Sequence, residues 1–308
     1  MSGPADESSP PSVRGLLVAL SRGVRSRPST ELALVALPLP TLLVLVATLP
    51  GTEAWALSLA AEGVFESRWT LWTAFASSFV HTDPTHLLDN VVNYWLLLAV
   101  AYPLSVVAGW RRRLLYAAVA YLALVPFVSA WATLFAFGGA TDAPAAGFSD
   151  VNRAFLGYLV VVWFAALATE TGPAAASAST RPEGASTTRS PGVDARWSLV
   201  VAFGSLAAVF LSPSGAGYFP PSPWVSLPFA VVAVVGGGVL YGRAGRPRVT
   251  GLDLTAPREL LYVTGGSVGA AGVIGSLVIV PLGSNVFAHL AGYAVGFSVA
   301  FLWVIADS

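Results

Sequence analysis

Three short stretches of this chain, 81–90, 147–150 and 289–296, carry polar side chains suited to chemistry in otherwise apolar surroundings. A serine hydroxyl becomes an effective nucleophile when an adjacent base takes its proton, and neutral imidazole suits that task near neutral pH. Ser149 is therefore the candidate nucleophile and His289 the candidate base. All three histidines of the chain lie in these stretches.

Each of these residues also has an ordinary structural interpretation. A serine at a helix start is commonly only a cap, and a histidine near a membrane surface is commonly a hydrogen-bonded structural residue. Gly292 and Gly296 are small residues four apart, which is typical of a face where two helices pack closely. Such packing would bring His289 toward the helix of Ser149, so the structural and the catalytic interpretations predict the same contact.

The elements that must position these residues are membrane-spanning helices. Hydrophobic types make up 55% of the 308 residues and charged types 10%, with a mean hydropathy of +0.71; a soluble domain carries about 25% charged residues. A helix of about 20 apolar residues crosses a bilayer core of roughly 30 Å. We therefore expect an all-α polytopic membrane protein with about eight spans, at residues 31–49, 86–108, 114–137, 148–168, 198–214, 224–242, 260–281 and 286–306.

Arginine positions predict the orientation, because cytoplasmic loops are enriched in positive charge. Lysine is absent, and with the N-terminus inside, the arginines between spans fall in cytoplasmic segments, apart from Arg68 in an outer loop and Arg153 within a span. We expect a cytoplasmic tail at 1–30, a membrane domain at 31–308 with a flexible cytoplasmic linker at 170–197, and both termini in the cytoplasm of a cell-membrane protein. The three polar stretches then share the outer end of the bundle.

Several functions are disfavoured by composition. The chain has no cysteine, which excludes disulfides and thiolate-bound zinc, and no basic domain that would favour nucleic acid as a partner. The tail lacks the apolar stretch of a cleavable signal peptide. The loop at 50–80 is rich in aromatic residues, which favours a position at the membrane interface.

The spacing of these motifs resembles the rhomboid family of intramembrane serine proteases. The resemblance covers about 72–109, 147–158 and 286–306. It is carried by His81-x4-His86-x3-Asn90, Gly147-x-Ser149 and His289-x2-Gly292-x3-Gly296, with Trp72 and Gly157 at further family positions.

The resemblance implies a serine endopeptidase with a six-helix core and no cofactor or metal. Ser149 is then the nucleophile and His289 its base, without a third acidic residue. His86 and Asn90 are the implied oxyanion donors, together with the Ser149 backbone N–H, and His81 has a more structural role. The implied partners are transmembrane protein substrates in the lipid bilayer, cut near the outer face where small or helix-breaking residues ease unwinding.

The chain departs from the family pattern in two ways. Asp150 replaces the glycine that usually follows the nucleophile, and we expect Arg153, three residues on, to neutralise it in a structural ion pair. An extra helical hairpin, formed by the spans at 198–214 and 224–242, separates the serine helix from the span at 260–281, which corresponds to the family's fifth helix. An odd number of crossings between Ser149 and His289 keeps both at one membrane surface.

Three alternatives stay open. A catalytically weak relative would bind transmembrane helices without cutting them, and Asp150 favours that version. A transporter or channel would show broken helices with charges at the midplane, which the glycine-rich span at 260–281 weakly resembles. A metal site built from the three histidines is the third, although no accompanying set of carboxylates is evident.

Overall fold

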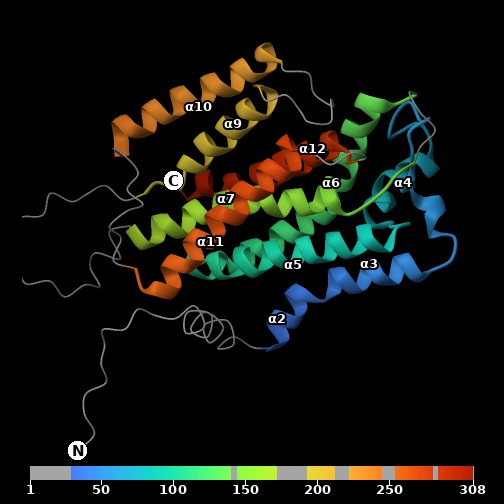
Figure 1. The fold of residues 1–308 in the computed structure, drawn as a ribbon, viewed down its shortest axis with the longest axis horizontal. Coiled ribbons are helices and arrows are strands. Elements are labelled where there is room, and N and C mark those ends of the chain that lie inside the picture. The colour runs from blue at the N-terminus through green and yellow to red at the C-terminus, as the bar shows by residue number, and fades with distance from the viewer. Residues whose placement is uncertain are drawn as a thin grey trace, which may run out of the picture.

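The computed structural model describes residues 29–139, 144–171, 193–211, 222–244, 254–279 and 284–307. These residues form a helical bundle with one short pair of strands (Figure 1). In chain order the elements are α2 (Ser29–Ala36), α3 (Pro38–Thr48), η1 (Thr52–Trp55), β1 (Leu57–Ser58), α4 (Arg68–Ala76), η2 (Ser77–Phe79), α5 (Pro84–Val107), α6 (Arg111–Phe137), β2 (Pro144–Ala145), α7 (Ser149–Thr171), α9 (Trp197–Leu211), α10 (Pro223–Ala244), α11 (Ala256–Val273), the π-helical turn η3 (Ile274–Val278) and α12 (Val286–Ala306).

Among the described residues, six helices are long and apolar enough to cross a membrane, and the bent pair α2–α3 makes a seventh if counted as one span. The chain is thus an all-α, multi-pass membrane protein. Eight full spans are not confirmed, because α9 has 15 residues. At 1.5 Å per residue it rises about 22 Å, less than a typical hydrocarbon core of roughly 30 Å.

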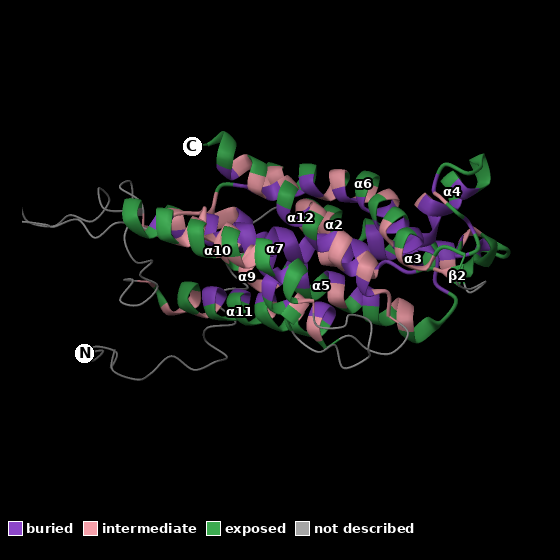
Figure 2. Cartoon of the chain, turned by 90° about the horizontal axis from the view of Figure 1, so that it is seen from above, coloured by how far each residue is buried: buried purple, intermediate pink, exposed green. Residues whose placement is uncertain are grey.

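Helix α7 forms the centre of the bundle. It is the most buried of the spans, and most of its residues carry the colour of buried residues in Figure 2. Helices α12 and α5 pack against it most extensively, followed by α6 and α11. By contrast, α10 is mostly exposed and packs chiefly on α9. The residue that begins α7 therefore sits among three or four other helices.

The order of the helices brings the starts of α7 and α12 to one end of the bundle. Of the described helices, α9, α10 and α11 lie between them in the chain, and α12 runs in the same direction as α7 (Figure 1). Helix α5 also begins at this end. The three polar stretches of the sequence are therefore close together in space.

The segment between α3 and α5 is an ordered cap over this end, not a simple loop. Strand β1 pairs antiparallel with β2, with Leu57 opposite Ala145. This pairing ties the cap to the residues that immediately precede α7. Phe65, Trp69 and Trp72 are exposed on the cap, as expected for aromatic side chains at a membrane interface.

Two parts of the predicted domain organisation fall largely outside the described residues. They are the N-terminal tail, of which residues 1–28 are not described, and the linker, of which 172–192 are not described.

Candidate active site

Ser149 and His289 form a direct hydrogen bond. Oγ of Ser149 lies 3.0 Å from Nε2 of His289, although 140 residues separate them in the chain. Ser149 is the first residue of α7, and His289 lies in the first turn of α12. Asn285 caps α12 by accepting from Ala288 N, and its amide donates to Thr133 Oγ1 of α6 at 2.6 Å. The start of α12, and with it His289, is therefore held in place by α6.

The other ring nitrogen of His289 is also held. Nδ1 lies 3.1 Å from the backbone oxygen of Ser276 in η3. A carbonyl can only accept, so Nδ1 carries the proton and Nε2 of the neutral ring is left to accept from the Ser149 hydroxyl. The Ser276 carbonyl thus orients the imidazole in the way that a carboxylate does in a three-residue triad. Nothing in the sequence pattern marks Ser276, because its part is played by a backbone atom.

Close packing of α12 on α7 makes this meeting possible. A Cβ placed on Gly292 would overlap the Asp150 carbonyl, and one on Gly296 would overlap the backbone of Ala154. The two helices therefore approach through their backbones, as expected for small residues four apart. The carbonyl of Gly296 also accepts from Tyr121 Oη of α6 at 2.8 Å.

Gly147 sets the path of the chain into α7. Its φ of +127° lies in a region that residues with a Cβ rarely adopt. A Cβ there would also come within 2.5 Å of His86 Cε1. The Gly147 N–H donates to the Ser77 carbonyl at 3.0 Å. The glycine before the candidate nucleophile thus lets the His86 ring lie against the backbone.

The two expected oxyanion donors differ in availability. Within the described residues the His86 ring makes no hydrogen bond, so its N–H is free to donate into the cavity. The Nδ2 group of Asn90, in contrast, lies 3.0 Å from His81 Nε2 and 3.1 Å from the His86 carbonyl. Both of its hydrogens are engaged, so Asn90 must release one of these partners before it can donate to a substrate. Ser149 is the first residue of α7, and the dipole of this helix adds positive potential there.

His81 connects the cap to the site as a buried structural residue. Its Nδ1 donates to the Phe79 carbonyl at 3.3 Å, while Nε2 accepts from Asn90 and from the Phe148 N–H. Burial, and then the neighbouring His86, lower the pKa of His81 to about 4, and the Phe79 carbonyl opposes this only in part. The ring is thus neutral at physiological pH and can accept these bonds.

Stability is expected to fall on mild acidification because of His81. Its pKa is about 4 when folded and 6.5 in an unfolded chain, so the unfolded state binds more protons between these values. Its contribution is complete above pH 6.5 and lost as the pH falls toward 4, about 2 kcal/mol of it between pH 7 and pH 5. Melting temperatures in detergent should drop less over this interval for His81→Gln than for the wild type. An equal drop would contradict the assignment.

Asp150 does not pair with Arg153, so the expected ion pair is wrong. Oδ2 of the buried Asp150 accepts from Ser78 Oγ at 2.8 Å and from Ser129 Oγ, and Oδ1 accepts from the Val151 N–H. The carboxylate thus joins the cap and α6 to the start of α7. Ser129 is one of the few polar residues in the apolar part of α6, and such a residue is the signal that could have indicated a partner.

The dyad opens into a polar cavity of about 740 Å³. Ser149, His289, His86, Asn90 and Arg153 all line it. Its volume falls in the range of small-ligand pockets, and a polar lining admits water. The Ser149 side chain is therefore accessible from this cavity.

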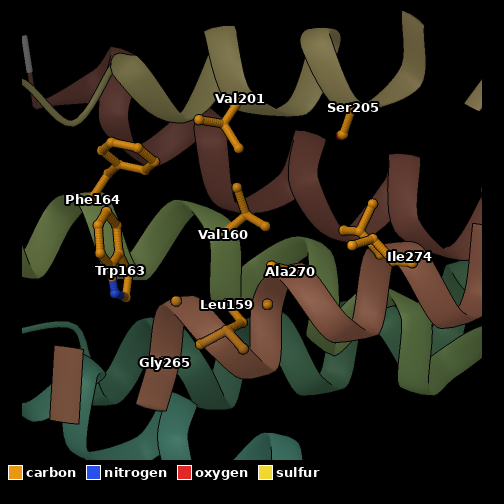
Figure 3. Close-up of a pocket in the computed structure, with 12 residues that line it drawn as sticks. Leu159, Val160, Trp163, Phe164, Val201, Ser205, Gly265, Ala270 and Ile274 are labelled. Carbon is orange, nitrogen blue, oxygen red and sulfur yellow. The ribbon is translucent and has the colours of Figure 1, made fainter. Parts of the chain in front are cut away.

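A second cavity, of about 430 Å³, lies between α7, α9 and α11. Figure 3 shows Leu159, Val160 and Trp163 of α7 facing the glycine-bearing side of α11 across it, with Val201 of α9 above. Its lining is almost wholly apolar, and neither Ser149 nor His289 contributes to it. This lining favours hydrocarbon chains and offers neither member of the Ser149–His289 pair.

The three histidines do not assemble into a metal site. In the part of the chain that the structure describes, no group of three or more His, Asp or Glu side chains could hold a metal ion.

No protein-family model, curated protein or solved structure matches this chain. The function must therefore be inferred from the site itself.

Proposed function

We propose that this protein is an intramembrane serine endopeptidase that uses a Ser149–His289 dyad. The observation that carries the proposal is the 3.0 Å hydrogen bond between the serine hydroxyl and an imidazole whose other nitrogen is held by the Ser276 carbonyl. A catalytic triad consists of a nucleophile, a base and a group that orients the base. Here the Ser276 carbonyl takes the place of the third group.

In the proposed reaction, Oγ of Ser149 attacks the carbonyl carbon of the scissile peptide bond and its proton passes to Nε2 of His289. The resulting oxyanion accepts from His86 and from the backbone N–H of Ser149. The tetrahedral intermediate collapses as the imidazolium gives its proton to the leaving amine nitrogen. Water, deprotonated by the same imidazole, then hydrolyses the ester and restores Ser149.

The proposed substrate is a transmembrane helix of another protein. A peptide bond in such a helix is shielded by its own hydrogen bonds and by lipid, so the segment must unwind into the polar cavity before attack. Small or helix-breaking residues near the bond lower that cost. By the arginine pattern, the cavity opens toward the outer face and both termini lie in the cytoplasm; these assignments stay predictions.

The alternative is a relative that binds such helices without cutting them. The argument for it is Asp150, since a negative charge near a developing oxyanion slows acylation. However, the Asp150 carboxylate is occupied by two serine hydroxyls and a backbone N–H. These hydrogen bonds indicate a structural role for Asp150, which favours an active protease over a relative that does not cut.

A fluorophosphonate probe tests the proposal directly. The purified protein in detergent is expected to label at one serine, and Ser149→Ala is expected to abolish labelling, because only an activated hydroxyl attacks phosphorus. Ser205→Ala, which removes a hydroxyl from the apolar cavity, is the matched control and should label normally. A folded wild-type protein that does not label would favour the non-cutting relative, and persistent labelling of Ser149→Ala would exclude Ser149 as the nucleophile.

A further inference from the structure

Arg153 carries a positive charge in the catalytic cavity, and no described residue pairs with it. It lies four residues after Ser149 on α7, and therefore on the same helix face about 6 Å deeper. It lines the same cavity as Ser149 and His289. Within the described residues its guanidinium makes no ion pair or hydrogen bond, and Nε is buried without a partner.

Such a group is costly to keep. Arg153 is partly buried, and a charge without a counter-ion is costly at membrane depth, where ionisable residues commonly serve function for that reason. The nearest acidic residue in the chain, Asp150, is engaged elsewhere. The other aspartates that line the cavity, Asp83 and Asp89, are exposed, so they belong to its rim and not to its floor.

The geometry points to a carboxylate of the substrate as the missing partner. We propose that Arg153 determines specificity by binding the side chain of an aspartate or glutamate next to the scissile bond; this inference rests on the proposed protease function. A segment whose carbonyl reaches Ser149 places its adjacent side chains in the same cavity, one helical turn from the guanidinium. Arginine binds carboxylates in a two-pronged geometry, which gives direction as well as charge.

The observations favour a substrate side chain over a lipid phosphate. The Arg153 guanidinium shares its cavity with the nucleophile, so an anion there would compete with the segment being cut. Asn90, Asp150 and Ser149 line this cavity together with Arg153, so hydrogen-bonding groups that suit a peptide segment surround the guanidinium. The apolar cavity between α7, α9 and α11 is a separate space.

Cleavage of paired substrates tests the inference. Pairs of transmembrane reporters differ only in having Glu or the near-isosteric Gln at one position next to the cleaved bond. One pair tests the residue before the bond and a second pair tests the residue after it. Wild-type kcat/KM is expected to be about 10-fold to 100-fold higher for Glu at one of these positions, as a hydrogen bond to a charged group implies. Arg153→Gln should bring the ratio to about one, and Arg153→Lys should retain part of it. Arg112→Gln, which removes an exposed charge near the other end of the bundle, should leave it unchanged.

A binding measurement separates this inference from the protease proposal. Fluorescence anisotropy of Glu and Gln peptides is measured on Ser149→Ala and on Ser149→Ala with Arg153→Gln, so no cleavage is needed. Tighter binding of the Glu peptide that Arg153→Gln removes would support the carboxylate site even if fluorophosphonate labelling fails. Cleavage or binding with no Glu preference, or with a preference that survives Arg153→Gln, would overturn it. If the Glu and Gln peptides bound equally and anionic lipid vesicles displaced both, Arg153 would be assigned to a lipid phosphate. That result would also overturn the inference.

Discussion

His289→Ala is expected to lower the rate of fluorophosphonate labelling and of substrate cleavage by a factor of about 10⁴ or more. The variant removes the only base within hydrogen-bond distance of the Ser149 hydroxyl in the described structure. Without it, the serine must lose its proton to water in the course of attack. Rates are measured by gel fluorescence over time and by proteolysis of a transmembrane reporter in detergent.

His86→Ala is the informative comparison, because it removes a hydrogen-bond donor without removing the base. Loss of one oxyanion donor costs about 10²-fold to 10³-fold in kcat. A smaller loss than for His289→Ala, with the melting temperature unchanged, is therefore expected. If both variants lost the same small factor, or if His289→Ala kept its full rate, the dyad assignment would have to be abandoned.

Gly296→Val is expected to destabilise the protein by about 3 kcal/mol or more and to abolish activity, although Gly296 does not line the catalytic cavity. A side chain at this position would overlap the backbone of Ala154, so α12 would have to move away from α7. A displacement of about 1 Å at the dyad would itself cost about 10²-fold in rate. The melting temperature and the labelling rate are measured on the same sample.

Gly238→Val provides the matched control for this substitution. Gly238 also lies within a helix, α10, but a Cβ there meets nothing within 4 Å. This variant should melt close to the wild type and label at the same rate. Equal behaviour of the two valine variants would show that the α7–α12 contact is not the constraint that positions His289.

The membrane character and the helix positions followed from the sequence because hydropathy is a local property. Every predicted span overlaps a helix of the structure, from α3 to α12, and the six longest apolar helices agree with a multi-pass protein. The prediction was less accurate at α9, where Pro213 and Pro220 follow an apolar stretch of limited length. The close contact at Gly292 and Gly296 was also predictable, since small residues four apart indicate it without knowledge of the partner.

What the sequence by itself determined was therefore the set of helices, the end of the bundle at which polar residues gather, and the candidacy of Ser149 and His289. Only the tertiary structure decided which atoms meet: the Ser276 carbonyl at His289, the two serines at Asp150, and, among the described residues, no partner at Arg153. The reason is physical. Helix formation depends on neighbours three and four residues away, whereas these contacts join residues up to 72 positions apart and are set by how η2, α6, η3 and α12 pack around α7.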